Sequence, residues 1–149
     1  MKVYRHLPAA KRPCVVTIGN YDGLHLGHQK IIETLIFESS IRKIETAVIT
    51  FDPHPKEFFS PLIAPARIMS LREKLEFFDA HRIDRVYVIK FNQKFSEITS
   101  EEFIKVLKKI KTKLVVVGKD FKFGNRRKGT IDQISRNLID VIGQEEVRQ

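Results

Sequence analysis

The sequence of 149 residues contains a single cysteine and no tryptophan, and it has no long apolar run. Because Cys14 has no second cysteine to pair with, an internal disulfide is excluded and a reducing, cytoplasmic environment is expected. No apolar stretch approaches the roughly 18 residues of a membrane-spanning helix, and residues 1–13 lack the apolar segment of a signal peptide. The five histidines lack the spacing of Cys/His metal sites, so we expect no metal held by the protein alone.

The composition is that of one folded domain with a strongly basic surface. Apolar residues make up 42% and charged residues 30%, a mixture typical of globular proteins. The net charge is +9, and residues 105–128 hold ten lysines or arginines against one acid, Asp120. Such a field attracts phosphate groups, although a solvated surface has the same composition. No nucleic-acid-binding motif is present, so a small polyphosphate substrate is favoured over a nucleic acid.

Short apolar runs alternate with helical patterns along the chain. Residues 31–36 have helical spacing, and capping boxes at Ser70–Glu73 and Thr99–Glu102 predict the starts of two further helices. Uniformly apolar strands separated by helices favour a parallel sheet that is covered on both faces. We therefore predict one α/β domain over residues 1–149, a doubly wound, mostly parallel open sheet. Its predicted strands are Cys14–Ile18, Ala47–Phe51, Val86–Ile89 and Leu114–Val117.

In such sheets, ligands bind at the carboxyl ends of the strands, so the loops after Ile18, Phe51 and Val117 are the candidate site. We examine these three loops in turn.

The first loop and the start of the helix after it read GNYDGLHLGH over residues 19–28. Gly19, Gly23 and Gly27 allow the backbone to approach a ligand closely, and the helix start offers free N–H groups to an anion. His25 and His28 flank Gly27 and can donate hydrogen bonds to phosphate oxygens. The segment is neither a Walker A loop nor a dinucleotide-binding fingerprint. Its His-x-Gly-His tetrapeptide is similar to the signature of the nucleotidyltransferase superfamily.

The second loop, TFDPHP over residues 50–55, is rich in proline and is followed by Phe58 and Phe59. Rigid prolines and aromatic rings suit the wall of a flat, apolar ligand, but a proline-rich surface loop with buried aromatics has the same pattern. The third loop, residues 118–129, combines three glycines with several cations and suits a loop that faces phosphate. Its alternative is a basic hairpin with two core residues, Phe121 and Phe123.

Taken together, the three loops resemble one family over residues 14–130. The chain is similar to the adenylyltransferase module of the bacterial bifunctional riboflavin kinase/FMN adenylyltransferases, also called FAD synthetases. The resemblance rests on four segments: TIGNYDGLHLGH (17–28), TFDPHP (50–55), LREKL (71–75) and GKDFKFG (118–124).

This resemblance implies a Rossmann-like nucleotidyltransferase fold and the transfer of AMP from ATP to the FMN phosphate, which yields FAD and pyrophosphate. It implies Mg²⁺ held mainly by phosphates and water, and neither a nucleic acid nor a membrane as partner. The catalytic residues would be His25 and His28. The residues at ATP would be Gly19, Asn20, Gly27, Gly118 and Asp120, and those at FMN would be Phe51, Pro53, Pro55, Phe59 and Phe123.

Two departures from the family pattern separate this sequence from its relatives. Tyr21 stands where the family usually has phenylalanine, and the added hydroxyl needs a partner. The family's Ile-Ser-Ser-Thr-x-x-Arg segment and riboflavin kinase domain are absent from these residues, and residues 134–137, ISRN, are a poor substitute. We therefore expect weak FAD synthesis. A non-catalytic flavin- or nucleotide-binding remnant, a transferase for another phosphorylated acceptor and a basic nucleic-acid binder remain as alternatives.

Overall fold

The computed structural model describes residues 1–21, 26–52 and 70–145, and these residues form a layered α/β domain. The central sheet has six strands in the order β1-β4-β3-β2-β5-β8, and all neighbouring pairs are parallel. Its strands are β1 (Lys2–Tyr4), β2 (Cys14–Ile18), β3 (Glu45–Asp52), β4 (Arg85–Lys90), β5 (Thr112–Gly118) and β8 (Asp140–Gln144). The chain runs from β2 outward through β3 to β4, then returns to the other side of β2 for β5 and β8. The prediction of a doubly wound parallel sheet is confirmed.

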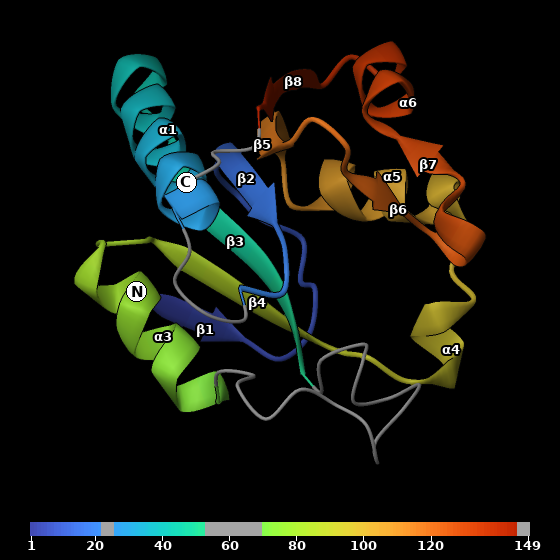
Figure 1. Ribbon diagram of the computed structural model, residues 1–149, viewed down its shortest axis with the longest axis horizontal. Coiled ribbons are helices and arrows are strands. Elements are labelled where there is room, and N and C mark those ends of the chain that lie inside the picture. Colours follow the sequence, from blue (N-terminus) through green and yellow to red (C-terminus); the bar gives the residue numbers. More distant parts are fainter. Residues whose placement is uncertain (22–25, 53–69, 146–149) are drawn as a thin grey trace.

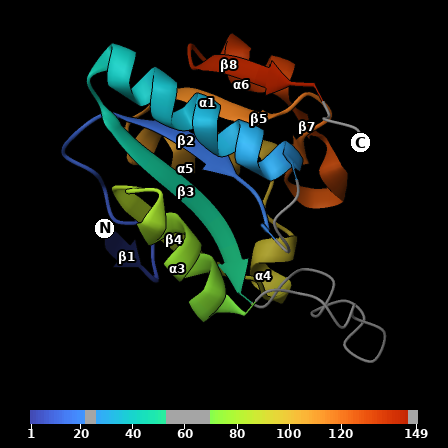
Figure 2. The ribbon, with the colours of Figure 1, turned by 60° about the vertical axis from the view of Figure 1, so that its left-hand side comes forward.

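Helices cover both faces of the sheet (Figure 1). Helices α1 (Leu26–Arg42) and α3 (Leu71–Ala80) lie on one face, and α5 (Ser100–Lys109) and α6 (Ile131–Arg136) lie on the other. Figure 2 shows α1 and α3 in front of the strands and α5 behind them. None of the helices in the described part of the chain is both long and apolar enough to cross a membrane.

Two smaller units lie beyond the carboxyl ends of the strands. The short helix α4 (Gln93–Ser96) follows β4. An antiparallel hairpin of β6 (Lys122–Phe123) and β7 (Gly129–Thr130), with the 3₁₀ turn η1 (Asn125–Arg127) at its tip, follows β5. The sequence pattern did not predict either unit, nor the edge strands β1 and β8.

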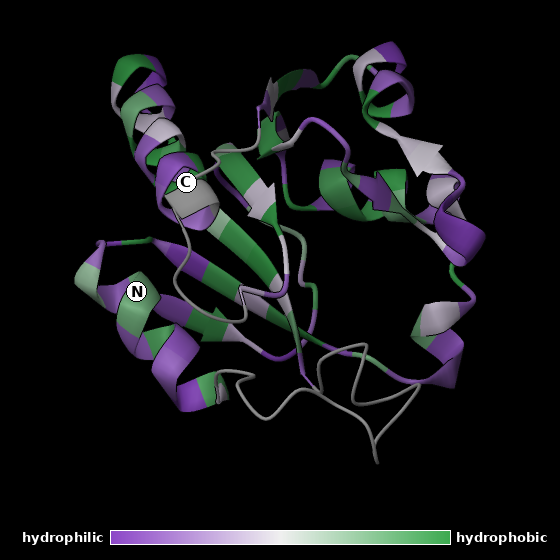
Figure 3. Ribbon diagram, viewed as in Figure 1, coloured by the Kyte–Doolittle hydropathy of each residue, from purple (hydrophilic) through white to green (hydrophobic). Residues whose placement is uncertain are grey.

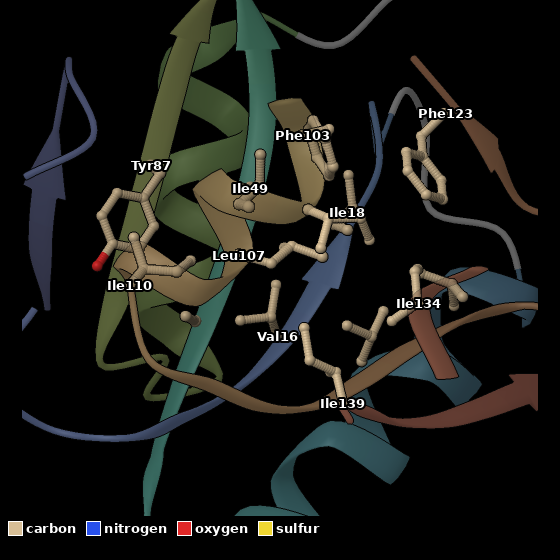
Figure 4. Packing of buried hydrophobic residues seen from close by; sticks show 14 of the residues in the cluster. Val16, Ile18, Ile49, Tyr87, Phe103, Leu107, Ile110, Phe123, Ile134 and Ile139 are labelled. Atoms are coloured by element: carbon tan, nitrogen blue, oxygen red, sulfur yellow. The ribbon is translucent and has the colours of Figure 1, made fainter. Parts of the chain in front are cut away.

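Alternate residues of the central strands belong to two separate cores, because both faces of the sheet are buried. Val15, Val48 and Leu114 pack under α1 and α3, whereas Val16, Ala47 and Val115 pack under α5. Figure 3 shows the strands as a largely apolar layer between helices whose polar residues face outward. The core on the α5 side, shown in Figure 4, extends from Ile110 to Phe123, Phe103 and Ile18 at the carboxyl edge of the sheet.

The two predicted capping boxes are confirmed. The backbone N–H of Glu73 donates to Ser70 Oγ at 3.1 Å, and the Ser70 N–H donates to Glu73 Oε1 at 3.3 Å. Thr99 and Glu102 make the same reciprocal pair, with both bonds at 3.1 Å. The hydrogen bonds from Thr99 lower the pKa of Glu102. Each box satisfies two backbone or side-chain groups that a bare helix start would leave unpaired, and so fixes where α3 and α5 begin.

Candidate active site at the carboxyl edge of the sheet

The turn after β2 is tied to β3. The Gly19 N–H donates to the Ile49 carbonyl oxygen at 3.0 Å, and Thr50 Oγ1 donates to the Asn20 carbonyl oxygen at 3.4 Å. A Cβ on Gly19 would lie 3.1 Å from the Tyr21 ring, so the turn is too close-packed for a larger residue without adjustment. The side-chain Oδ1 of Asn20 is buried and has no hydrogen-bond partner among the described residues. The backbone of this turn is therefore held in place by the sheet.

Tyr21 supports this turn from beneath. Its backbone has a left-handed φ of 52°, its side chain is buried, and its hydroxyl shares a hydrogen bond of 2.7 Å with the buried Thr17 hydroxyl. Burial raises the pKa of Tyr21. The ring packs edge-on against Phe78, with 5.3 Å between centroids. The hydroxyl that departs from the family pattern thus has the partner it requires.

His28 lies in the first turn of α1, beside Tyr21. Its ring centroid is 4.9 Å from that of Tyr21, and the residue is half-buried. Because the first turn of a helix presents unpaired N–H groups and a partial positive charge, this end of α1 suits an anion. Gly27 is the second residue of the same helix. His25 lies outside the described residues.

A cavity of about 600 Å³ opens beside this turn at the carboxyl ends of β2, β3 and β4. Its walls are mainly phenyl rings. Phe51 at the end of β3 lies 5.9 Å from Phe91 and 5.6 Å from Phe95, and the Phe121 and Phe123 rings stack 5.8 Å apart. The full lining is Ile18, Gly19, Asn20, Phe51, Phe91, Phe95, Ser96, Ile98, Phe103, Phe121, Lys122, Phe123, Gly124, Arg126 and Arg127. Such a lining suits a flat, apolar ring system with a few polar groups at its edge.

Two glycines hold the β6–β7 hairpin over the cavity. Gly124 has a φ of 77°, and a Cβ there would lie 2.8 Å from the Ser100 backbone nitrogen. A Cβ on Gly129 would lie 2.5 Å from the Phe123 ring. The Asn125 N–H donates to the Ile98 carbonyl oxygen at 2.7 Å. Both interpretations of this loop therefore apply, because it is a basic hairpin, and Phe121 and Phe123 pack on the core while lining the cavity.

The structure brings together four of the predicted site residues and separates others. Gly19, Asn20, Phe51 and Phe123 line the cavity. Gly118 ends β5, and Asp120 is exposed in the turn after it, so neither lines this cavity. Pro53, Pro55 and Phe59 lie outside the described residues. The roles predicted for all these residues stay predictions.

The sequence analysis missed the contribution of the segment after β4. Phe91, Phe95 and Ile98 line the cavity, and Phe103 from α5 lies behind them. The available signal was positional, because β4 is a predicted strand whose carboxyl end meets the same edge as β2 and β3. The analysis followed only the loops after three of the four predicted strands.

A second cavity, of about 680 Å³, lies at the opposite edge of the sheet, where β3 and β4 begin. Its principal charged residue is Arg85, which pairs with Glu45 at 2.7 Å and donates to the carbonyl oxygens of Arg12 and Ile110. These bonds fasten the N-terminal segment to the sheet, so Arg85 has a structural role. The chemistry of a doubly wound sheet belongs at the other edge.

Comparison with known proteins identifies the family. A sequence model described as FAD synthetase matches residues 7–147. The chain belongs to the FAD synthetase family. It is 39% identical over 118 residues to the bifunctional riboflavin kinase/FMN adenylyltransferase of Buchnera aphidicola subsp. Schizaphis graminum, a match that covers 78% of this chain and 38% of that protein. It is 38% identical over 123 residues to the protein of the same name from Escherichia coli K12, covering 81% and 39%. The chain thus spans about two-fifths of the length of these curated relatives.

Solved structures show the same fold at low sequence identity. A crystal structure titled macrolide-efflux protein from Streptococcus pneumoniae is 23% identical, with a TM-score of 0.85, and the match covers all of this chain and 53% of that one. Pantoate–β-alanine ligase from Thermus thermophilus is 12% identical, with a TM-score of 0.65 over all of this chain and 63% of that one. The likeness confirms the Rossmann-like nucleotidyltransferase fold that the FAD synthetase resemblance implied.

Proposed function

We propose that the chain is an FMN adenylyltransferase. An oxygen of the FMN phosphate forms a bond to the α-phosphorus of ATP, the bond from that phosphorus to the β-phosphate bridging oxygen breaks, and pyrophosphate leaves. The product is FAD. Membership of the FAD synthetase family and the phenylalanine-lined cavity beside an anion-binding helix start support this assignment.

The cavity is the observation that carries the choice of acceptor. Phe51, Phe91 and Phe95 from one side and Phe121 and Phe123 from the other present apolar ring faces. An isoalloxazine ring is flat, aromatic and polar only at its edge, whereas a polar alcohol phosphate would leave these walls in contact with water. In this proposal the ring occupies the cavity, and Pro53, Pro55 and Phe59 extend its wall.

The turn after β2 and the start of α1 are assigned to the phosphates. The FMN phosphate is largely dianionic at pH 7, because the second pKa of a phosphate monoester is about 6, so its attack on ATP requires no general base. The site must instead bring two anions together and stabilise the charge that develops on the α-phosphate and pyrophosphate. His28, His25 and the N–H groups of Gly27 and its neighbours supply hydrogen-bond donors for that purpose. Gly19, Asn20, Gly118 and Asp120 are assigned to the nucleotide.

Mg²⁺ enters this proposal as the partner of ATP. No acidic residue lines the cavity in the part of the chain that the structure describes, so phosphate oxygens and water are the expected ligands. The ion would neutralise charge on the polyphosphate.

The rate of this 149-residue chain is a separate part of the proposal. Ser135 and Arg136 are exposed at the end of α6, and Arg136 borders a different hollow, together with Thr99 and Lys128. They do not supply hydroxyl and guanidinium groups to the aromatic cavity. Charge-assisted hydrogen bonds are each worth roughly 1.5–3 kcal/mol, and each 1.36 kcal/mol changes a rate about tenfold. We therefore expect FAD formation by this chain to be orders of magnitude slower than by a version extended through an Ile-Ser-Ser-Thr-x-x-Arg segment.

An acceptor panel tests the proposal. The chain is incubated with MgATP and with FMN, riboflavin or a small polar alcohol phosphate, and pyrophosphate and adenylylated products are measured. Pyrophosphate release with FMN alone supports the proposal. Release with the alcohol phosphate identifies a transferase for another acceptor, FMN binding without release identifies a non-catalytic binder, and salt-sensitive binding of nucleic acid without any response to ATP would overturn both.

A further inference from the structure

The charged side chains at the margin of the aromatic cavity all come from the β6–β7 hairpin. Among the residues that the structure describes, Lys122, Arg126 and Arg127 are the charged residues of the lining. Gly19 and Asn20 line the cavity from the turn after β2. Figure 1 places that turn and the hairpin on two sides of the carboxyl edge of the sheet. The cavity therefore has a cationic side and a side that leads to His28.

The backbone that carries the two arginines is held in an uncommon conformation. Arg126 and Arg127 have φ values of 55° and 53°, in the left-handed region that residues with a Cβ seldom adopt. Such a conformation persists where the surroundings determine it. Here the Arg127 N–H donates to the Gly124 carbonyl oxygen at 3.0 Å, and the neighbouring Asn125 N–H is bonded to Ile98. Both guanidinium groups thus start from a fixed point beside the cavity.

These two arginines have no carboxylate partner within 4.0 Å among the described residues, whereas Arg42, Arg72 and Arg85 each have one. A guanidinium presents five N–H donors in a plane and binds planar acceptors well. The donors of Arg126 and Arg127 are therefore available to a ligand in the cavity.

We propose that Arg126 and Arg127 donate hydrogen bonds to the carbonyl edge of the flavin ring and so determine specificity for the flavin. This inference rests on the proposed function, which puts the ring in the cavity. The ring carries two carbonyl groups with an imide N3–H between them, and phenyl walls cannot pair these groups. A buried carbonyl without a donor weakens binding, so the site requires donors at this edge. The phosphate of the same ligand must meet ATP beside His28, which leaves the arginines for the ring.

The charge of the arginines has a measurable effect on the ring itself. A cation beside the imide stabilises its deprotonated form, so the N3–H of bound flavin should titrate at a lower pH than that of free flavin. Removal of an arginine should reverse part of this shift. A residue that only shaped the cavity would change affinity without changing the titration.

The test compares R126Q, R127Q and the double variant with K128Q, which removes one charge from the same hairpin at a residue outside the cavity lining. Dissociation constants for riboflavin and for FMN are measured by flavin fluorescence, and N3–H of the bound flavin is titrated by absorbance. We expect each arginine variant to weaken both flavins about tenfold and to raise the N3–H titration by about one pH unit. K128Q should change neither, and R127K should keep the titration of the parent chain.

The contrary outcomes are distinct. Weakening of FMN alone would assign the arginines to the phosphate, and an equal effect of K128Q would assign the result to general charge; either overturns the inference. Normal flavin binding by folded arginine variants of a chain that makes FAD overturns the inference alone. If the unaltered chain binds neither flavin, the proposed function fails together with it. Because the arginine side chains are exposed, thermal midpoints within about 2 °C of the parent are expected.

Discussion

Replacement of Tyr21 by phenylalanine removes one atom from the support of the catalytic turn, and its cost follows from the structure. The Tyr21 hydroxyl and the Thr17 hydroxyl are 2.7 Å apart, and the two residues are 4% and 0% exposed. Y21F keeps the ring against Phe78 and His28 but leaves the Thr17 hydroxyl without this partner. A buried hydroxyl deprived of its partner costs about 1–3 kcal/mol. We expect Y21F to lower the free energy of unfolding by about 1–2 kcal/mol, a drop in Tm of about 2–8 °C at this chain length.

A double-mutant cycle separates the hydrogen bond from other effects of the substitution. T17V alone leaves the Tyr21 hydroxyl unpaired and should cost about as much as Y21F. The double variant T17V/Y21F removes both hydroxyls, so it should cost about 1–2 kcal/mol less than the sum of the single variants. Urea unfolding followed by circular dichroism gives all four free energies. Additive costs would show that the two hydroxyls do not interact, and the account of the turn would be wrong.

The same pair gives a pH dependence with a defined sign. Burial raises the pKa of Tyr21 in the folded state, whereas the unfolded tyrosine titrates near 10. The contribution of Tyr21 to stability is therefore complete below pH 10 and is lost above it, because only the unfolded chain then releases the proton. The stability difference between the parent and Y21F should shrink by roughly 1.4 kcal/mol for each pH unit above 10. A difference that stays constant to pH 11 would contradict the burial of the hydroxyl.

Three further predictions concern the site and the core. H28A should lower the rate of FAD formation by about 10²–10³-fold while changing the free energy of unfolding by about 1 kcal/mol or less, and near-normal turnover of the folded variant would remove His28 from the phosphate site. G124A should lose about 1–3 kcal/mol and weaken FMN binding, because its φ is 77° and the new Cβ would lie 2.8 Å from Ser100 nitrogen; for stability, G118A is the matched control, since nothing lies within 4 Å of a Cβ there. Burial raises the pKa of Cys14 to about 11, so a thiol reagent at pH 8 should label it orders of magnitude faster in denaturant than in the folded chain, and rapid labelling without denaturant would refute its burial.

The core of the fold could be predicted because local pattern and tertiary position agree there. Each predicted strand lies within an observed one, and the capping boxes at Ser70 and Thr99 begin helices in the structure. The edge strands gave no such signal. Strand β1 has three residues, the first two of them exposed, and β8 is only half-buried, so neither shows a uniformly apolar run. Both form because a neighbouring strand offers its backbone groups.

The site could be predicted in part, for a similar reason. Gly19, Phe51 and Phe123 follow apolar strands or lie in glycine-rich segments, and they meet at one cavity. Arg126 and Arg127 adopt left-handed backbone conformations without being glycine or asparagine, so no residue type signals the turn. Phe91 and Phe95 follow β4 in a segment whose alternation of polar and aromatic residues also suits a surface helix. Tertiary contacts alone bring these residues to the cavity.

Transfer of the α-phosphate of ATP to FMN is the central claim, and labelled ATP tests it most directly. The chain is incubated with FMN, Mg²⁺ and ATP labelled either at the α- or at the γ-phosphate, and the products are separated by chromatography. The account predicts that the α-label elutes with a flavin at the position of FAD, and that the γ-label appears in pyrophosphate in equal amount. An α-label that remains in ATP or free AMP while FMN is bound, or a γ-label that appears on the flavin, would contradict the account.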